Sequence, residues 1–271
     1  MIRALFVGML LWAGASASAQ VNWKKVRILV YTKNGKGYVH DNIPFAVACF
    51  QRLGKEQGFT VDSTSNPAVF TEASLARYNA LVFTSTNNDV FDTDVQRLAF
   101  RRYIEAGGGF VGIHSVMGTE RNWYWFKRML GGTFAWHPKF QKLRVVKLDK
   151  EHPSLAGLPD VWEKEDECYF SKELSPGPTV IMAHDLTSLD TSQRAQIRTF
   201  GGGYTRLYPA VWHHRFDGGH TWCTALGHDK KDYQDPVFTK HLFQGLAFVV
   251  SQVKKVDFGK AYAKERDEEV R

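Results

Sequence analysis

Histidines follow several of the apolar runs that read as strands, at positions where they could act on a ligand. His114 comes directly after the run 110–113, and His228 follows the run 221–226. His40 stands just before a predicted helix that Asp41 is placed to cap, which leaves the imidazole free. Imidazole titrates near neutral pH and binds metals, so these residues could act as general bases or ligands. The competing interpretation is structural, since a histidine at such a corner can simply hold it with hydrogen bonds.

A carboxylate usually accompanies histidines in a metal or acid–base site. Asp166 and Glu167 follow the mixed run 162–165, whose charges we interpret as a solvated face. Of the two, we expect Glu167 to point inward, next to Tyr169. His137 leaves an ordered segment for a loop and could reach the same pocket.

The chain contains eight tryptophans, Trp123 among them. Indole rings stack on sugar faces, but they also fill apolar cores, so this count supports both interpretations. Motifs for nucleotide binding are missing, and Gly107 to Gly109 precede a strand, where they end a helix. We therefore expect no nucleotide cofactor.

The elements that must position these residues alternate between strands and helices. Strands are predicted at 26–31, 60–62, 80–84 and 110–113, with a helix from Ile43 to Gly58 and another capped by Thr93 and Gln96. This order indicates βαβ units and a flavodoxin-like α/β fold, with a mostly parallel sheet flanked by helices. Ligands bind such sheets at the carboxyl ends of the strands. Further strands at 143–147, 179–182, 209–212 and 221–226 precede a closing helix that begins at Pro236.

Residues 1–19 have the features of a secretory signal peptide, with a basic start, a short apolar stretch and small residues ending in Ala17-Ser18-Ala19. The mature chain is therefore expected to be secreted, into the periplasm. We expect one α/β domain over residues 20–253. Residues 254–271 are charged and lack apolar spacing, so we expect a tail that packs loosely or not at all.

The net charge of +7 is spread along the chain, which argues against nucleic acid as a partner, and no later run is apolar for long enough to span a membrane. Cys49, Cys168 and Cys223 lie among apolar neighbours and are expected to be buried thiols, with a disulfide left open. The oligomeric state also stays open, a homo-oligomer included.

Several motifs together resemble the ThuA-like (trehalose utilisation) family of the class I glutamine amidotransferase-like superfamily. They occur in the family's order over residues 26–250, and they are GGGFVGIH (107–114), GGTF (131–134), HP (137–138), DECY (166–169), PAVW (209–212) and ALGHD (225–229).

The resemblance implies that His40, His114, His137, Glu167 and His228 are the functional candidates. His114 occupies the corner at which amidotransferases carry a catalytic cysteine, so Cys-dependent glutamine hydrolysis is not expected. It also implies a role in carbohydrate use, with trehalose-like or 3-keto sugars as candidate substrates.

Two classes of function remain open. The first is an enzyme, an isomerase, lyase or hydrolase acting on a glycoside or keto-sugar. His114, Glu167 and His228 would be catalytic, and His40, His137, Tyr169 and Trp123 would bind substrate. A divalent Zn, Mn or Co ion would be held by His40, His114, Glu167 and His228. The second is a non-catalytic carbohydrate-binding protein. A serine hydrolase would need Ser115, which stands one residue after the corner.

Overall fold

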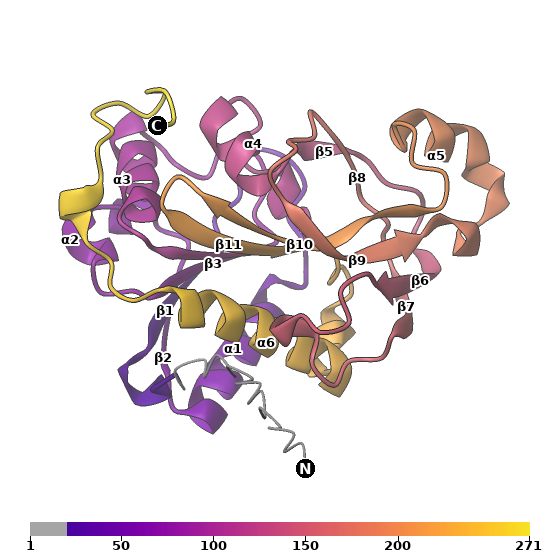
Figure 1. Cartoon of the computed structure of the whole chain (residues 1–271), viewed down its shortest axis with the longest axis horizontal. Coiled ribbons are helices and arrows are strands. Elements are labelled where there is room, and N and C mark those ends of the chain that lie inside the picture. The colour runs from indigo at the N-terminus through magenta and orange to yellow at the C-terminus, as the bar shows by residue number, and fades with distance from the viewer. Residues whose placement is uncertain (1–20) are drawn as a thin grey trace, which may run out of the picture.

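The predicted strands and one further strand, β7, form a nine-stranded sheet across the middle of the computed structural model (Figure 1). The structure describes residues 21–271, so the signal peptide predicted at 1–19 lies outside the described residues. The strands of this sheet are β1 (Arg27–Tyr31), β2 (Thr60–Thr64), β3 (Ala80–Thr84), β4 (Gly109–Ile113), β6 (Gln141–Lys147), β7 (Val161–Asp166), β9 (Thr179–Asp185), β10 (Leu207–Phe216) and β11 (Gly219–Thr224).

Their order is β2-β1-β3-β4-β11-β10-β9-β6-β7. The strands from β2 to β11 run parallel. From β11 onward each strand is antiparallel to its neighbour. Strand β7 consequently points in the same direction as β1, β4 and β11, and its carboxyl end lies at the same edge of the sheet.

Helices cover both faces of the sheet and enclose two apolar cores (Figure 1). On one face lie α1 (Ile43–Gln57) and α6 (Pro236–Gln252). On the other lie α2 (Glu72–Leu75), α3 (Asp94–Glu105) and α4 (Tyr124–Leu130). This arrangement confirms the predicted α/β class and the flavodoxin-like order of the first strands.

Local sequence signals fix the helix ends where the chain was expected to turn. Thr93 and Gln96 form the predicted capping box of α3. Gly58 ends α1 with φ of 88°, a left-handed conformation that glycine adopts without the steric cost of a Cβ. Asp235 caps α6 by accepting hydrogen bonds from the backbone N–H groups of Val237 and Phe238.

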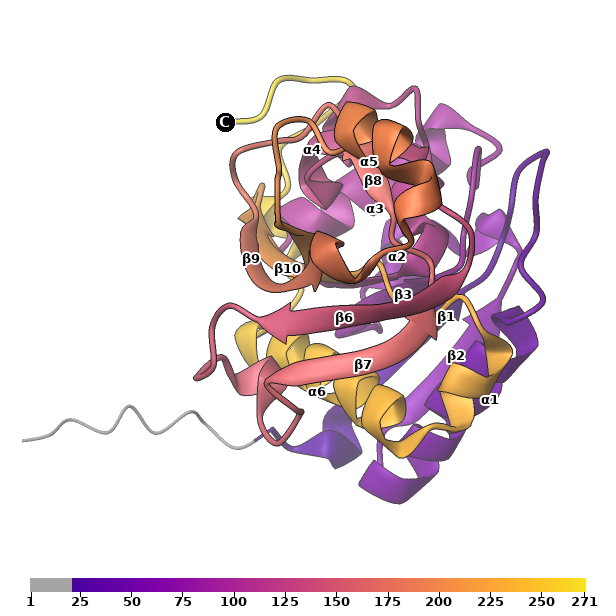
Figure 2. The same cartoon turned by 90° about the vertical axis from the view of Figure 1, so that its right-hand side faces the viewer.

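Some elements were not predicted. They are α5 (Arg194–Phe200), the helix α4, and the two-stranded sheet formed by β5 (Thr133–Trp136) and β8 (Phe170–Lys172). The run 162–165, interpreted above as a solvated face, is part of β7, which lies beside β6 at the near edge in Figure 2. Glu163 and Glu165 are exposed, as that interpretation expects, but the strand itself was not predicted, because charged side chains conceal the alternation that buries Trp162 and Asp166.

The segment 254–271, expected to pack loosely, is held firmly against α3. Arg101 is fully buried and donates hydrogen bonds to the carbonyl oxygens of Arg266, Glu268 and Glu269. Glu105 accepts from the backbone N–H groups at 262 and 263, at 2.9 and 3.0 Å. Hydropathy could not reveal this docking, because it depends on backbone groups of the tail and a buried ion pair on the helix.

All three cysteines are free and buried, as expected of internal thiols. Among residues 21–271, no helix has the length and apolar character needed to cross a bilayer.

Candidate functional site

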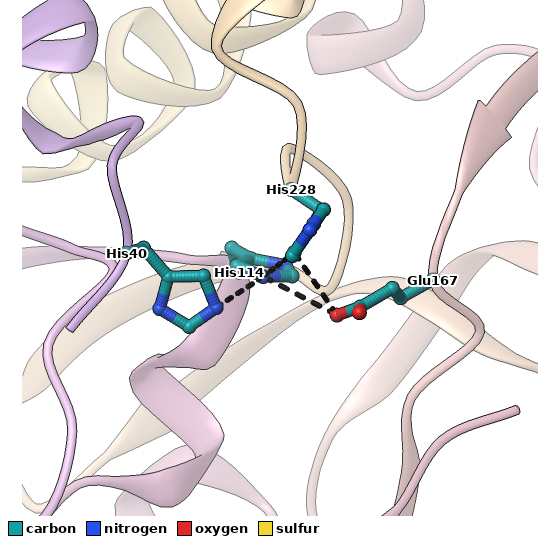
Figure 3. Close-up of side chains that lie close together, drawn as sticks. All are labelled: His40, His114, Glu167 and His228. Atoms are coloured by element: carbon teal, nitrogen blue, oxygen red, sulfur yellow. Dashed lines mark hydrogen bonds and ion pairs between the residues drawn. The ribbon is translucent and has the colours of Figure 1, made fainter. Parts of the chain in front are cut away.

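Four side chains from separate segments meet at the carboxyl edge of the sheet (Figure 3). His40 lies in the loop after β1, His114 follows β4, His228 follows β11, and Glu167 follows β7. One ligand atom from each residue lies within 4.8 Å of the others. The sequence therefore identified the four members of this cluster correctly as neighbours.

His114 occupies a sharp corner between β4 and a 3-10 turn, with φ of 55°. This left-handed conformation is unfavourable for a residue with a side chain, and such strain is typical of functional positions. The ring is fully buried, and its Nδ1 lies 3.2 Å from the carbonyl oxygen of Ala225. Because a carbonyl only accepts, Nδ1 carries the proton and Nε2 presents a lone pair to the cluster.

His40 is held in the corresponding tautomer by Ser115. The Ser115 hydroxyl lies 3.2 Å from the carbonyl oxygen of Thr86, to which it donates. It must therefore accept from the Nδ1–H of His40, 3.3 Å away. The Nε2 of His40 is left with a lone pair, and it lies 3.1 Å from the Nε2 of His114.

His228 and Glu167 complete the cluster. The Nδ1 of His228 lies 3.3 Å from His114 Nε2 and 3.1 Å from Glu167 Oε2. Although Oε2 is close to His228 and 3.7 Å from His114, it is buried and makes no hydrogen bond of good geometry. A buried carboxylate oxygen without a hydrogen bond is costly unless a cation approaches it.

The loop after β11 is hydrogen-bonded to the end of β7. These bonds hold Glu167 beside the histidines, although β7 is the last strand in the sheet order. Asp166 accepts from the backbone N–H groups of Gly227 and His228, at 2.8 and 3.2 Å. Burial alone would raise the pKa of Asp166, but the adjacent Lys164 and His114 outweigh it and hold that pKa at about 2. Asp166 therefore stays ionised and fixes the backbone beside His228.

Burial and mutual proximity set the charges of the cluster. Burial lowers the pKa of His40 to about 3, and the neighbouring histidines add to this effect. Burial likewise lowers the pKa of His114 to about 4, although nearby carboxylates oppose it. Contact with Glu167 raises the pKa of His228. Burial pushes the pKa of Glu167 up, but His228 and the other histidines outweigh it and lower that pKa. At neutral pH the cluster thus contains the Glu167 carboxylate beside the unprotonated rings of His40 and His114.

The structure also brings His137 and Tyr169 to the cluster. His137 Nδ1 lies 2.8 Å from the carbonyl oxygen of Pro138 and 3.4 Å from Glu167 Oε1. The Tyr169 hydroxyl lies 3.1 Å from His114 Nε2. Burial strongly raises the pKa of Tyr169, so the hydroxyl keeps its proton.

Trp123 does not join this group, and its predicted role in substrate binding was wrong. The ring is buried in the core beside Phe91 and Phe126, and its Nε1 donates to the carbonyl oxygen of Arg266. The core interpretation therefore holds for Trp123, whose ring also contacts Phe100 of α3.

Sequence reasoning missed two residues that position the cluster, Asp166 and Asn42. Asn42 makes no side-chain cap at the start of α1, although it occupies the N-cap position. Its amide instead donates to the carbonyl oxygens of Gly227 and His228, at 2.8 and 3.0 Å. Asp41, expected to cap the helix, pairs with Lys230. The sequence offered one signal for these roles, which is that Asn42 lies close to His40 and Asp166 lies next to Glu167.

The arrangement fits a divalent cation. Two imidazole lone pairs that face each other at 3.1 Å cannot hydrogen-bond to each other, and an unpartnered carboxylate oxygen lies beside them. Imidazole and carboxylate donors bind Zn²⁺ at about 2.0–2.2 Å, a length compatible with donor atoms this close together. Mn²⁺ and Co²⁺ accept the same donor types.

The chain matches the family model described as "ThuA: Trehalose utilisation" over residues 27–249. It is similar in structure to a ThuA-like protein from Bacteroides uniformis ATCC 8492, with 22% identity, TM-score 0.69, and coverage of 88% of this chain and 97% of that one. A ThuA-like protein from Parabacteroides merdae ATCC 43184 gives 18% identity, TM-score 0.66, and coverage of 90% and 99%.

A β-galactosidase from Rahnella sp. R3 also shares the fold, with 17% identity and TM-score 0.55, over 82% of this chain and 31% of that one. No curated protein sequence matches the chain.

Proposed function

The chain belongs to the ThuA (trehalose utilisation) family, and on that premise we propose that it is a metal-dependent enzyme acting on a glycoside or an oxidised keto-sugar. The observation that carries the proposal is the convergence of His40, His114, His228 and Glu167 around one point. Ala225 and Ser115 bond the other ring nitrogens of two of these histidines, and Asp166 bonds the backbone N–H of His228. Such outer contacts hold metal ligands in position.

Keto-sugars suit such a site because the proton on the carbon next to the carbonyl is acidic. A divalent cation would polarise the carbonyl oxygen or lower the pKa of a bound water. Isomerisation or elimination then needs a base close to that carbon, and hydrolysis needs one close to water. The three reactions therefore share one set of residues.

His137 is best placed to move the proton. It stands outside the group of four, and its Nδ1–H is directed to the carbonyl oxygen of Pro138, which leaves Nε2 as a proton acceptor. Glu167 Oε1 lies 3.4 Å from the same Nδ1 and helps to orient the ring. The Tyr169 hydroxyl keeps its proton and can donate to a developing oxyanion.

Metal content and turnover test the proposal together. The purified protein is stripped with a chelator, reloaded with Zn²⁺, Mn²⁺ or Co²⁺, and assayed with trehalose, 3-keto-trehalose and simple glycosides. We expect one metal ion per chain and turnover that returns with the metal. His114→Ala should lose both. His213→Ala is the matched control, because His213 stacks on His152 outside the cluster.

A different set of results would overturn the proposal. If the protein binds no metal in a fixed ratio, gains no thermal stability from these ions, and keeps its sugar affinity in His114→Ala, it is a non-catalytic carbohydrate-binding protein.

We also propose that the protein works after export, in the periplasm, on the basis of the signal-like residues 1–19. Mass spectrometry of the protein recovered from its native host tests this. A mature chain beginning at Gln20 is expected, and a cytosolic chain that keeps Met1 would contradict it.

A further inference from the structure

An apolar cavity of about 180 Å³ lies directly behind Tyr169, outside the histidine cluster. Its walls come from β9, β10 and the turn after β4, and they include Met117, Val180, Tyr208 and Trp212. Leu174 and Tyr204, at 45% and 43% exposed, also line it, so the cavity reaches solvent beside them. No charged side chain lines it.

The polar groups of Trp212 and Tyr208, two of its aromatic walls, are already bonded within the protein. Trp212 Nε1 donates to the carbonyl oxygen of Leu130 at 2.8 Å. The Tyr208 hydroxyl accepts from the backbone N–H of Ser171 at 2.8 Å and donates to the carbonyl oxygen of the same residue at 3.2 Å. None of the cavity residues holds a buried polar atom that lacks a partner. A hydroxyl-rich sugar could pair with few side chains here, those of Ser171, Ser175 and Tyr204, and would lose most of its hydrogen bonds to water on entering, whereas an apolar group would not.

The cavity walls resist collapse. Pro176, Pro178 and Pro209 line the cavity, and each ring fixes its own φ. Gly131 ends α4 with φ of +94°, and a Cβ added there would lie 2.4 Å from Pro178 Cγ, so the backbone is already in close contact at this side. Because protein interiors are close-packed and contain few voids larger than a water molecule, a space of this size is unusual.

The cavity volume matches a single ring. An engineered apolar cavity of about 150 Å³ binds benzene. Aromatic walls favour an aromatic guest, because rings attract each other in offset or edge-to-face contacts. We propose that this cavity is a binding site for one planar, largely apolar ring, such as a phenyl group.

The same cavity contacts the histidine cluster through two shared residues. Tyr169 presents its ring to the cavity and its hydroxyl to His114 Nε2, and Ala225 lines the cavity while its carbonyl oxygen bonds His114 Nδ1. A ring bound here would therefore lie one side chain away from His114. It could be the aglycone of a glycoside held at the cluster, or a separate small molecule.

Phenol is a suitable probe, and calorimetry on the full chain measures its binding. Val180→Phe should fill the cavity and weaken phenol binding by at least about tenfold. Tyr204→Ala, at the exposed opening, removes one ring contact and should weaken binding by about threefold without a risk to folding. Val161→Phe and Tyr124→Ala are matched controls at exposed positions outside the cavity, and both should bind phenol as the unaltered protein does.

Phenol that fails to bind saturably would overturn this assignment, and so would equal affinity in the unaltered protein, Val180→Phe and Tyr204→Ala. Turnover distinguishes the two sources of the ring. If phenol competes with phenyl glucoside but not with methyl glucoside, the cavity holds the aglycone; if it affects both equally, the ring is a separate ligand. If no sugar is turned over but phenol binds, the proposed enzymatic function fails while the cavity assignment stands.

Discussion

The Nε2 atoms of His40 and His114 lie 3.1 Å apart, and each ring has its other nitrogen bonded to a fixed acceptor. The partners are Ala225 on one side and Ser115, held in turn by Thr86, on the other. Two lone pairs are thus held facing each other before any ligand arrives. An arrangement that repels itself without a cation gains most when one binds, so the partners of the rings should control metal affinity.

The first prediction concerns Ser115. Ser115→Ala removes the acceptor of His40 Nδ1–H and frees the ring to adopt the other tautomer, so Zn²⁺ affinity measured by competition with a chromophoric chelator should fall about tenfold or more. Ser192→Ala, an exposed serine, should leave it unchanged. The unaltered protein should also resist a fluorophosphonate, because the Ser115 hydroxyl donates to Thr86. Labelling that disappears in Ser115→Ala would indicate a serine nucleophile instead.

The second prediction concerns Asp166. Asp166→Asn keeps the shape but removes the charge that faces Lys164 and one acceptor for the backbone N–H groups of Gly227 and His228. We expect metal affinity to fall about 10- to 100-fold and the free energy of unfolding to fall by about 3 kcal/mol. Glu165→Gln, on the exposed side of the same strand, is the control for both measurements. Unchanged metal affinity would show that Asp166 has no positioning role.

Regular periodicity made the first half of the fold predictable. Strands β1, β3 and β4 are continuous apolar runs, and between them α1 stops at Gly58 and α3 begins at the capping box of Thr93. The second half was less predictable because several of its elements are short, such as β5, β8 and α5, and because β7 carries a charged side chain inward. Strand β7 buries Asp166 against Lys164, a pairing that is visible in three dimensions alone.

The histidines were predictable because each of them follows a strand that the sequence predicts, and ligands bind at the carboxyl ends of such strands. The partners that orient the histidines were not, since they act through backbone groups far away in sequence. Asn42 reaches the loop at 227 and 228, and Glu167 arrives from the last strand of the sheet order. Trp123 was assigned to the pocket because indole rings stack on sugars, but its ring is buried in the core.

The third prediction concerns the C-terminal segment. Arg101→Met leaves Glu105 and Asp217 buried without their cation and removes the donors that hold the tail carbonyl groups. The free energy of unfolding should fall by about 3 to 5 kcal/mol, measured by chemical denaturation. Arg198→Met, at an exposed position on α5, should change it little. Metal affinity should be unchanged in both variants, and a loss in Arg101→Met alone would mean that the tail supports the cluster.

The fourth prediction is a pH dependence of stability that originates in His241. This ring is fully buried on α6, with Nε2 3.1 Å from Thr224 Oγ1, and burial lowers its pKa from 6.5 to about 3. Below pH 6.5 His241 binds a proton in the unfolded chain but not in the folded chain. The free energy of unfolding therefore decreases as the pH falls toward 3. This one group contributes up to about 1.4 kcal/mol per pH unit in that window and nothing above it.

In the presence of a chelator, His241→Gln should therefore show a shallower loss of unfolding free energy than the unaltered protein between about pH 6.5 and 4.5. Above pH 7 the two curves should run parallel, because neither state of either protein then binds this proton. Equal slopes at acidic pH would mean that His241 becomes protonated in the folded state.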